Sequence, residues 1–566
     1  MILGIWDGHD AGAAVVDERE GRIVCAANEE RFTRRKLEVG FPYAAIGACL
    51  SEAGLEPKDL TEVAISTFDP AKTLTRVFPS LKEKYYLLRR RKVRPRILDP
   101  WKRTFKHELT TWRPNRLTRR LSEAALVRDL SRAGLGRARI HWTRHHKAHA
   151  ATAAYTSGFD SALVLTLDGV GDGLSGTISS FSRGKLTLLS AIGARDSFGI
   201  FYEMATRLLN MRELEDEGKV MALASYGYAA PDGRNPFLDL FQVDGMKVAC
   251  RLSPPALSRL LATELAMMPS EQFAFLAQEA LEARVVELAR NALRATGMKR
   301  LAYAGGVASN IQVNRRLRAL PECEEIFVFP HMGDGGLALG SALELAAERG
   351  ASSYPLGDLR LGPALRPGEI ESALRNSGAC FRAAGDPAGE AARRIAEGAV
   401  VFWFQGRMEY GPRALGGRSI LARPDSESLR DRLNLKLKRR VWYQPFCPSI
   451  LDEEAERLLE GGETKNRFMT MAYGVRGEGR DLLKGVIGRD GTCRPQMVDE
   501  SYGLYHRLLE ETRKATGVGA VLNTSFNLHG EPLVSTPAQA VDCFLRSGAD
   551  ALVMGDFLLE RPGASR

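Results

Sequence analysis

Two stretches of the chain, far apart in sequence, repeat one pattern of strands and turns. Each begins with an apolar strand that runs into an Asp-Gly turn, and two further β-like stretches follow. The first copy runs through Ile2–Trp6, 7–12, Ala13–Val16 and Arg22–Asn28, and the second through Ala162–Leu167, 168–173, Ser175–Phe181 and Lys185–Ile192. This repetition predicts a duplicated α/β unit. Both turns would present a carboxylate and free backbone N–H groups to the space between the halves.

Glycine-rich turns follow two later strands of the same part of the chain. A strand over Arg300–Ala304 opens onto Gly305, Gly306 and Asn310, and a strand over Ile326–Phe329 leads to Gly335. Helical patterns precede and follow these turns, at Ser270–Ala295, Gln312–Arg318 and Leu337–Arg349. Because glycine lets a backbone approach a phosphate closely, Gly305, Gly306, Asn310 and Gly335 are predicted to bind a nucleotide.

A domain boundary is expected where glycine, proline and serine accumulate, between residues 350 and 367. The chain of 566 residues is long enough for two domains, placed at 1–355 and 370–566. The second contains an apolar strand over Ala399–Phe404 and β-like runs at Ala520–Leu522 and Ala551–Met554. It is predicted to be a smaller α/β domain.

A histidine pair suggests a metal site. His145 and His149 lie one helical turn apart on one face, while His146 points elsewhere and is a poorer ligand. With the carboxylates of Asp168 and Asp334 they would form a plausible site for Fe(II), Mn or Zn. The alternative is an exposed or capping histidine pair without a metal.

The positive charge of the chain is concentrated in one segment. The net charge is +10, and residues 81–120 contain fifteen Lys or Arg and three Asp or Glu, so the remainder sums to about −2. Aromatic residues such as Tyr85, Tyr86 and Trp101 are interleaved. The segment is either a surface for an anionic partner or a solvated excursion that balances an acidic neighbour.

Several classes of protein are disfavoured by simple absences. No apolar run is long enough to span a membrane, and the opening residues read as a strand instead of a signal peptide. The eight cysteines form no C-x-x-C pair, which disfavours a zinc ribbon or a disulfide scaffold and suits a reducing cytoplasm.

A second set of polar residues in the C-terminal part suggests an anion pocket. Arg413 and Arg418 lie in a Gly/Pro-rich loop, where a planar guanidinium can meet phosphate or carboxylate. Cations and amides that could join them are Lys438, Arg440, Arg494, Asn523, Ser525 and Asn527. The alternative is a basic surface with ordinary turns.

Taken in order, these motifs resemble one enzyme family along nearly the whole chain. They are Asp7-Gly-His9-Asp10-Ala-Gly, His145-x3-His149, Leu167-Asp-Gly-Val-Gly-Asp-Gly, Glu217-Gly-Lys-Val-Met-Ala, Gly305-Gly-Val-Ala-Ser-Asn, Gly333-Asp-Gly-Gly, Tyr410-Gly-Pro-Arg-Ala-Leu-Gly and Asn523-Thr-Ser-Phe-Asn. The chain resembles the ATP-dependent O-carbamoyltransferases of the nodulation and antibiotic-tailoring type. The resemblance implies an actin-like, sugar-kinase-like N-terminal domain similar to the tRNA threonylcarbamoyl transferase. It also implies a C-terminal domain similar to threonylcarbamoyl-adenylate synthase.

The resemblance also implies a reaction in two steps. The C-terminal domain would form carbamoyl adenylate from carbamoyl phosphate and ATP, with Mg²⁺ as a further ion, and release pyrophosphate. The N-terminal domain would then pass the carbamoyl group to a hydroxyl of a sugar-containing or natural-product acceptor. A closed chamber would protect the labile adenylate from water.

Site residues carry over by position. His145, His149 and Asp334 match the iron ligands, and Asp168 matches a further carboxylate beside the metal. His9 matches a general base for the acceptor hydroxyl, a role that suits a neutral imidazole, with Asp10 beside it. Arg413, Lys438, Arg494, Asn523, Ser525 and Asn527 match the adenylation pocket, and Arg418 and Arg440 are further cations nearby.

One stretch departs from the family. Its usual Lys-x-Arg-Glu-x-Trp-Arg-Pro-Phe-Ala-Pro reads here Lys438-Arg-Arg-Val-Trp-Tyr-Gln-Pro-Phe-Cys-Pro448. Val441, Tyr443 and Gln444 replace the acid, the tryptophan and the second arginine. One cation is therefore missing from the phosphate pocket, and Arg439 and Lys436 are the candidates to replace it.

Other functions remain open at this point. The chain could be a tRNA threonylcarbamoyl-type transferase that holds RNA on the basic segment, or a non-catalytic nucleotide-binding module. A hydrogenase-maturation carbamoyltransferase is disfavoured by the absence of C-x-x-C pairs. Sequence alone does not determine the acceptor, the metal or the oligomeric state.

Overall fold

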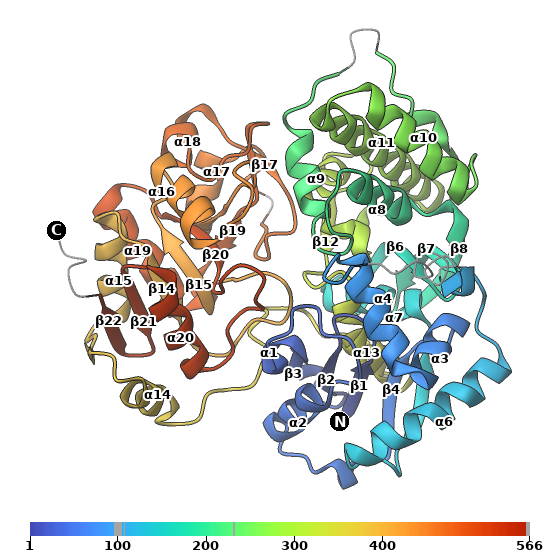
Figure 1. The fold of residues 1–566 in the computed structure, drawn as a ribbon, viewed down its shortest axis with the longest axis horizontal. Coiled ribbons are helices and arrows are strands. Elements are labelled where there is room, and N and C mark those ends of the chain that lie inside the picture. The colour runs from blue at the N-terminus through green and yellow to red at the C-terminus, as the bar shows by residue number, and fades with distance from the viewer. Residues whose placement is uncertain (95–104, 107, 230–232, 464, 562–566) are drawn as a thin grey trace. The chain divides into compact units, whose positions relative to one another are not determined.

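The computed structural model describes residues 1–94, 105–106, 108–229, 233–463 and 465–561 (Figure 1). The chain forms two compact units. The first comprises residues 1–29 and 37–357, and the second comprises 30–36 and 358–566. In the described part of the chain, no helix combines the length and the apolar character needed to cross a membrane.

The first unit is built from two five-stranded sheets with the same strand order. One runs β3-β2-β1-β4-β5 and the other β8-β7-β6-β11-β12. In each, the first strand pairs antiparallel with the second and parallel with a strand that returns much later in the chain. The bounds are β1 Ile2–Trp6, β2 Gly12–Asp17, β3 Arg22–Asn28, β4 Glu62–Ser66, β5 Arg139–Thr143, β6 Ser161–Gly171, β7 Leu174–Ser182, β8 Lys185–Gly193, β11 Arg300–Ala304 and β12 Glu325–Val328. The predicted duplicated, actin-like α/β fold is confirmed.

Two helices connect the sheets of the first unit. Helix α13 (Leu337–Glu348) packs on β1, β2 and β4, and α7 (His145–Thr156) packs on β6 and β11. The helices also pack on each other, and they approach so closely that a Cβ added to Gly340 would lie 2.1 Å from the carbonyl oxygen of Ala148. This contact fixes α7, the helix that carries the histidine pair, between the two repeats.

Helices also cover the outer parts of the first unit (Figure 1). They are α2 Tyr43–Glu52, α3 Pro70–Val77, α4 Pro79–Arg89, α6 Arg116–Arg132, α8 Phe198–Leu208, α9 Glu217–Ala224, α10 Pro254–Met267, α11 Ser270–Thr296 and α12 Ile311–Arg318. The basic segment predicted at 81–120 falls partly on α4 and the start of α6. Residues 95–104, which include Trp101, and residue 107 lie outside the described part.

The second unit is built on one mixed sheet of eight strands, in the order β13-β22-β21-β14-β15-β20-β16-β19. The bounds are β13 Phe381–Ala383, β14 Val401–Phe404, β15 Arg418–Ala422, β16 Cys447–Leu451, β19 Gln496–Val498, β20 Ala520–Ser525, β21 Ala551–Met554 and β22 Phe557–Glu560. Helices α15 (Pro387–Ala396) and α19 (Leu504–Thr516) bury one face of the sheet through Ile395 and Leu508. On the other face, Phe544 of α20 (Pro537–Ser547) packs against Phe402.

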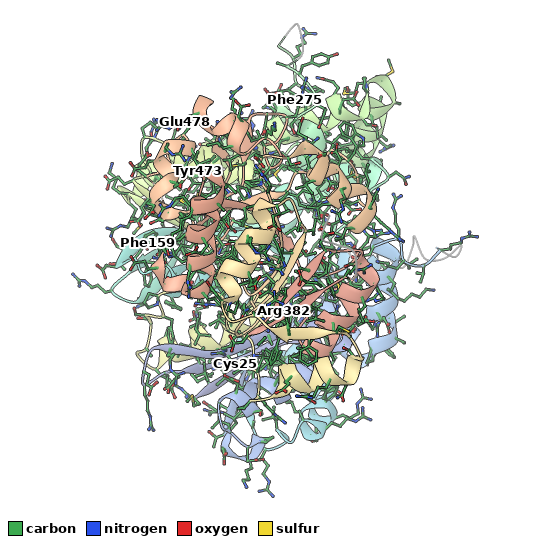
Figure 2. All side chains as sticks on the ribbon, turned by 90° about the vertical axis from the view of Figure 1, so that its left-hand side faces the viewer. Cys25, Phe159, Phe275, Arg382, Tyr473 and Glu478 are labelled. Carbon is green, nitrogen blue, oxygen red and sulfur yellow. The ribbon has the colours of Figure 1, made fainter. Side chains whose placement is uncertain are left out.

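Ion pairs lie on the surface of this unit. Arg382, labelled in Figure 2, lies 2.8 Å from Glu390, and Glu478 lies 2.6 Å from Arg457. Such exposed pairs stabilise the fold only slightly. The stability of the unit therefore rests on the apolar contacts of its sheet.

A short piece of the N-terminal sequence belongs to the second unit. Helix α1 (Glu30–Thr33) and residues 34–36 group with it. Arg31 donates to the carbonyl of Gly411 at 2.5 Å, and Arg34 donates to the carbonyls of Leu533 and Pro532 at 2.7 and 2.9 Å. The prediction had placed this piece in the first domain.

Candidate functional site

Four side chains of the first unit converge on one point. Helix α7 supplies His145 and His149, the end of β6 supplies Asp168, and the turn after β12 supplies Asp334. One ligand atom of each lies within 4.8 Å of those of the others. Nε2 of His145 lies 3.1 Å from Asp168 Oδ2, and Nε2 of His149 lies 3.6 Å from Asp334 Oδ1.

The surroundings of these side chains suit a divalent cation. Nε2 of His149 is buried without a hydrogen-bond partner among the described residues, so a lone pair is available to a metal. Oδ1 of Asp168 accepts the backbone N–H of Gly306 at 2.8 Å, which orients the carboxylate and leaves Oδ2 toward the histidines. Two imidazoles and two carboxylates fit Fe(II), Mn or Zn.

His146 is not part of this group. Its Nδ1 lies 3.0 Å from Thr166 Oγ1 and its Nε2 lies 3.1 Å from the carbonyl oxygen of Leu174. Both ring nitrogens are therefore used within the protein, and burial lowers the pKa of His146 to about 3. The prediction that His146 is the poorer ligand agrees with this geometry.

The charges of the cluster stabilise one another. Burial disfavours the imidazolium of His145, but Asp334 and Asp168 outweigh it and raise its pKa to about 9. Burial disfavours the carboxylate of Asp168 as well, but the hydrogen bond from His145 and the charge of His149 hold its pKa well below the usual value. A bound divalent cation would replace the imidazolium protons as the positive charge beside these carboxylates.

His9 lies directly beside the cluster. Its Nδ1 is 3.4 Å from Oδ2 of Asp334, and its backbone carbonyl accepts the indole N–H of Trp6 at 2.8 Å. Burial lowers the pKa of His9 to about 4, against the opposing charge of Asp334. The neutral imidazole is the form that a general base needs.

The side chain of Asp10, from the first repeat, lies beside the Gly335 turn of the second repeat. A Cβ added to Gly335 would lie 2.3 Å from Asp10 Oδ2 and 2.2 Å from Nε2 of His331, so only glycine fits there. Nε2 of His331 lies 2.9 Å from Asn28 Oδ1 and 3.8 Å from Asp10 Oδ2. Sequence reasoning missed His331 and Asn28. The position of His331, two residues before the Gly333-Asp334 turn, was the available signal.

The glycine turn after β11 also needs its glycines. Gly305 has φ +97°, and a Cβ there would lie 2.2 Å from the carbonyl oxygen of Leu167. Asn310 caps α12 by accepting the N–H of Val313 at 3.2 Å, and its amide N–H group donates to Gln278 at 2.8 Å. Asn310 therefore holds the turn in place, and its side chain is already engaged within the protein.

In the second unit, three arginines gather around Cys447. Arg494 donates to Cys447 Sγ from Nη2 at 2.9 Å and from Nε at 3.1 Å. Arg440 lies with its guanidinium 4.0 Å over the ring of Phe446. Burial lowers the pKa of Arg413 to about 9, and the charge of Arg494 lowers it further. Within the described ranges, no carboxylate forms an ion pair with these three arginines.

Lys438 has a different environment from these arginines. It follows a π-helical turn over Leu433–Leu437, and its ammonium donates to the carbonyl of Ser525 and, at 2.9 and 2.8 Å, to the carbonyl and Oδ1 of Asn527. Its three N–H groups are thus used by the loop after β20. Burial lowers its pKa to about 7. Lys438, Ser525 and Asn527 are brought together as predicted, with the lysine holding the loop.

Arg418 and Asn523 also have structural partners. The buried guanidinium of Arg418 donates to the carbonyls of Gln405 and Gly406, at 2.9 and 3.0 Å. Asn523 donates to the carbonyl of Ala414 at 3.1 Å, next to Arg413, while its Oδ1 is buried without a donor from the described residues. Arg418 thus supports the loop from within, and Asn523 connects it to β20.

Carboxylates neutralise much of the described part of the basic segment. Arg89 pairs with Glu203 and Glu213, and Arg90 pairs with Glu215. These contacts fasten α4 to α8 and to the loop after it. They favour the interpretation that this segment, residues 81–120 and here called the basic excursion, balances an acidic neighbour.

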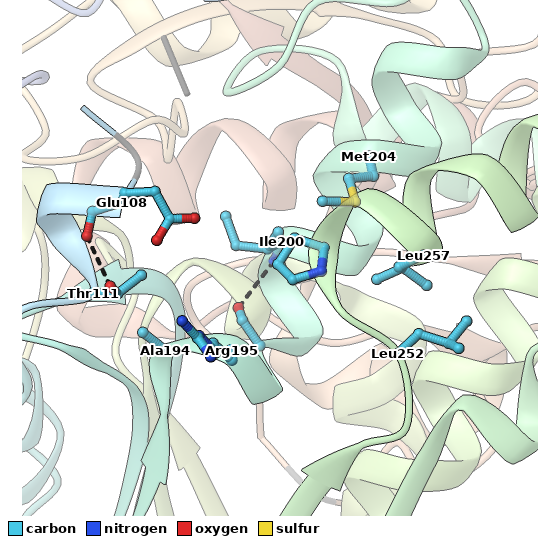
Figure 3. A pocket seen from close by; sticks show the side chains of 10 residues that line it. Glu108, Thr111, Ala194, Arg195, Ile200, Met204, Leu252 and Leu257 are labelled. Atoms are coloured by element: carbon cyan, nitrogen blue, oxygen red, sulfur yellow. Dashed lines mark hydrogen bonds between the residues drawn. The ribbon is translucent and has the colours of Figure 1, made fainter. Parts of the chain in front are cut away.

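A small pocket opens in the first unit (Figure 3). Ile200, Met204, Leu252 and Leu257 line it. Glu108 and Thr111 of the excursion and Arg195 supply polar groups at its edge. The hydroxyl of Ser197, another lining residue, donates to the backbone of Gly169 at 2.7 Å.

Comparison with known proteins gives two family matches. Residues 1–343 match the description Carbamoyltransferase N-terminus, and residues 392–561 match Carbamoyltransferase C-terminus. Nodulation protein NolNO of Sinorhizobium fredii is 34% identical over 575 residues, covering 98% of this chain and 80% of the relative. Nodulation protein NolO of Bradyrhizobium diazoefficiens is 37% identical over 437 residues, covering 74% of this chain and 79% of the relative.

Solved structures are only distantly similar. (R)-2-hydroxyglutaryl-CoA dehydratase component A of Acidaminococcus fermentans matches with a TM-score of 0.35 and 14% identity, covering 62% of this chain and 98% of that chain. The fold assignment therefore relies on the strand order described above.

Proposed function

The chain belongs to the carbamoyltransferase family, and from that premise we propose a two-step O-carbamoyltransferase. In the second unit, water would cleave carbamoyl phosphate to carbamate and phosphate, and the carbamate would then attack the α-phosphate of ATP, forming carbamoyl adenylate and releasing pyrophosphate. The first unit would transfer the carbamoyl group to a hydroxyl of a sugar-containing or natural-product acceptor. A cytoplasmic location remains a prediction.

The donor half of the proposal is supported by the uncompensated arginines. Arg413, Arg440 and Arg494 have no carboxylate partners among the described residues, and phosphate groups would supply the missing negative charge. Their fixed positions would also offset charge that grows on the α-phosphate as the carbamate oxygen attacks it. Lys438 would keep the Ser525–Asn527 loop against the nucleotide.

The transfer half is supported by His9 and its neighbours. A neutral imidazole at His9 would accept the proton of the acceptor hydroxyl as its oxygen attacks the carbamoyl carbon, and AMP would leave. The carboxylate of Asp334, 3.4 Å from Nδ1 of His9, would stabilise the imidazolium that results. The turns at Gly305 and Gly335 would bind the adenylate beside it.

His145, His149, Asp168 and Asp334 would hold the divalent cation. When bound, it would supply a Lewis acid beside the carbonyl of the carbamoyl group. His9, which stands outside this group of four, would remain free to move the proton.

The observation that carries the proposal is that each unit contains a set of groups suited to one half-reaction. The test is pyrophosphate release from ATP, with and without carbamoyl phosphate, on the metal-loaded full chain without an acceptor. We expect release that depends on carbamoyl phosphate, as a burst if the adenylate stays bound. Pyrophosphate release that does not depend on carbamoyl phosphate, or no release at all, would overturn the donor half of the proposal. Either result would implicate another acyl donor.

A further inference from the structure

The basic excursion reaches the catalytic centre of the first unit. Helix α4 brings the ring of Tyr86 to 4.9 Å from the ring of His9, with an interplanar angle of 33°. Further along the excursion, Nζ of Lys106 lies 3.6 Å from the centroid of Tyr85 and 4.9 Å from that of Tyr86. One layer of aromatic side chains thus separates Lys106 from the residue expected to activate the acceptor.

The charge of Lys106 is poorly compensated. In the part of the chain that the structure describes, Lys106 contacts aromatic rings and forms no ion pair, whereas Arg89 of the same excursion pairs with Glu203 and Glu213. A cation held only against aromatic faces leaves its N–H groups available for a ligand. This is the arrangement expected of a cation that meets its anion on binding.

The surroundings of Lys106 point the same way. Burial lowers the pKa of Lys106 to about 7, and the charges of Arg89 and Lys82 lower it further, while Asp69 and Asp334 oppose them. Lys82 is itself incompletely paired. Its Nζ lies 3.9 Å from Asp7, a carboxylate that Lys72 and Arg76 also contact, at 3.0 and 2.8 Å.

The carboxylates nearby are already engaged. Asp7 is shared by those three cations, and Asp69 caps α3, where its Oδ1 accepts the N–H of Lys72 at 2.7 Å. Asp334 belongs to the proposed metal site. Among the described residues, Lys106 therefore has no carboxylate partner of its own, and an added anion would reduce the mutual repulsion of Lys82 and Lys106.

We propose that Lys106 recognises an anionic group, a phosphate or a carboxylate, on the acceptor whose hydroxyl faces His9. The inference rests on the proposed transfer of the carbamoyl group by the first unit. Lys106 would be a specificity residue and Tyr86 would set its distance from His9. Glu108 and Thr111, a few residues further on, line the pocket in Figure 3, so the same excursion would contact other parts of the acceptor.

The topology favours the acceptor over the nucleotide as the source of this anion. The turns expected to approach the adenylate, at Gly305 and Gly335, follow β11 and β12 of the second repeat. Lys106 and Tyr86 lie in the excursion that follows β4 of the first repeat. The two sources can be separated by experiment, because the donor half-reaction proceeds without an acceptor.

The test measures how fast Lys106 is acetylated in the metal-loaded full chain. A brief pulse of an N-hydroxysuccinimide acetate is followed by peptide mass spectrometry, with the exposed Lys185 as the internal control. Glucose 6-phosphate and glucuronate are compared with glucose at constant ionic strength. An anion present at ten times its dissociation constant should slow acetylation of Lys106 by about tenfold, while glucose and Lys185 show no effect.

Three results would overturn the inference. They are acetylation that neither anionic sugar slows, equal protection by glucose, and protection by ATP with carbamoyl phosphate in the absence of sugar, which would assign Lys106 to the donor. Lys82→Gln should weaken the protection several-fold, and Lys247→Gln, at an exposed lysine of the same unit, is its matched control. Protection does not require turnover, so a failure of pyrophosphate release would count against the proposed function without affecting this result.

Discussion

The guanidinium of Arg494 donates to the sulfur of Cys447 from two of its nitrogens, at 2.9 and 3.1 Å. A thiol compensates a buried guanidinium less well than a carboxylate does. The positive charge of Arg494 also lowers the pKa of Arg413 and of Arg440. The pocket therefore holds positive charge whose partner would arrive with the substrate.

We expect Arg494→Gln to separate donor binding from stability. The KM for carbamoyl phosphate in pyrophosphate release should rise by about tenfold or more, because a charge-assisted contact to phosphate is lost. The melting temperature should stay equal or rise, since repulsion with Arg413 is relieved. Arg480→Gln, an exposed arginine of the same unit, is the control. An unchanged KM would remove Arg494 from the donor pocket.

Lys438→Ala should stop pyrophosphate release. The loss of three hydrogen bonds would free the Ser525–Asn527 loop, and Lys438→Arg should not restore activity because a planar guanidinium cannot reproduce a compact ammonium. Rates are compared with those of Lys484→Ala, where the side chain is exposed. Near-normal release by Lys438→Ala would show that the loop is held in another way.

His149→Ala should abolish carbamoyl transfer and leave pyrophosphate release intact. The imidazole that it removes is one of the four proposed metal ligands, so metal content by mass spectrometry should fall together with transfer. His141→Ala, a partly exposed histidine of β5, should retain both activities and the metal. Loss of both activities with the fold intact would contradict this division of labour.

Removal of the metal gives an independent test of the same division. Dialysis of the full chain against a chelator should stop transfer to any acceptor and leave carbamoyl phosphate-dependent pyrophosphate release in place. Fe(II), Mn(II) and Zn(II) are then added back singly to measure which restores transfer. Full transfer by the metal-free protein would exclude a role for the cation.

Gly305→Ala should destabilise the first unit. A Cβ at this position would lie 2.2 Å from the carbonyl oxygen of Leu167, and the backbone has φ +97°. The expected loss is about 2–4 kcal/mol in the free energy of unfolding, measured with denaturant. Gly218→Ala has open space around the new methyl group and should be close to neutral. Equal stability of the two variants would show that the turn can relax.

Much of the fold could be predicted from the sequence because hydrophobic pattern and turn residues agree there. The strands Ile2–Trp6, Arg22–Asn28, Arg300–Ala304 and Ala551–Met554 lie where the pattern puts them. Asp168 and Asp334 were recognisable because each comes next to glycines, Asp168 at the end of a buried strand and Asp334 in the turn after one. Such local signals are set by residues adjacent in sequence.

The partners of individual charged side chains were not predictable in the same way. Arg418 appeared as one more pocket cation, but its position on β15 turns the guanidinium into the fold, where the carbonyls of Gln405 and Gly406 use it. The charge of Arg89 suggested a partner outside the protein until Glu203 and Glu213 were seen beside it. Glu203 and Glu213 lie more than a hundred residues from Arg89 in sequence, so a local sequence pattern does not reveal them.

The assignment of residues 30–36 to the second unit affects the modularity of this enzyme. The chain enters that unit, leaves it, and returns more than three hundred residues later. A gene fission at residue 357 would yield a C-terminal polypeptide that lacks the donors of Arg31 and Arg34 for the carbonyls of Gly411 and Leu533. The two units are therefore joined by the path of the chain, and neither can be recombined with a foreign partner as an intact module.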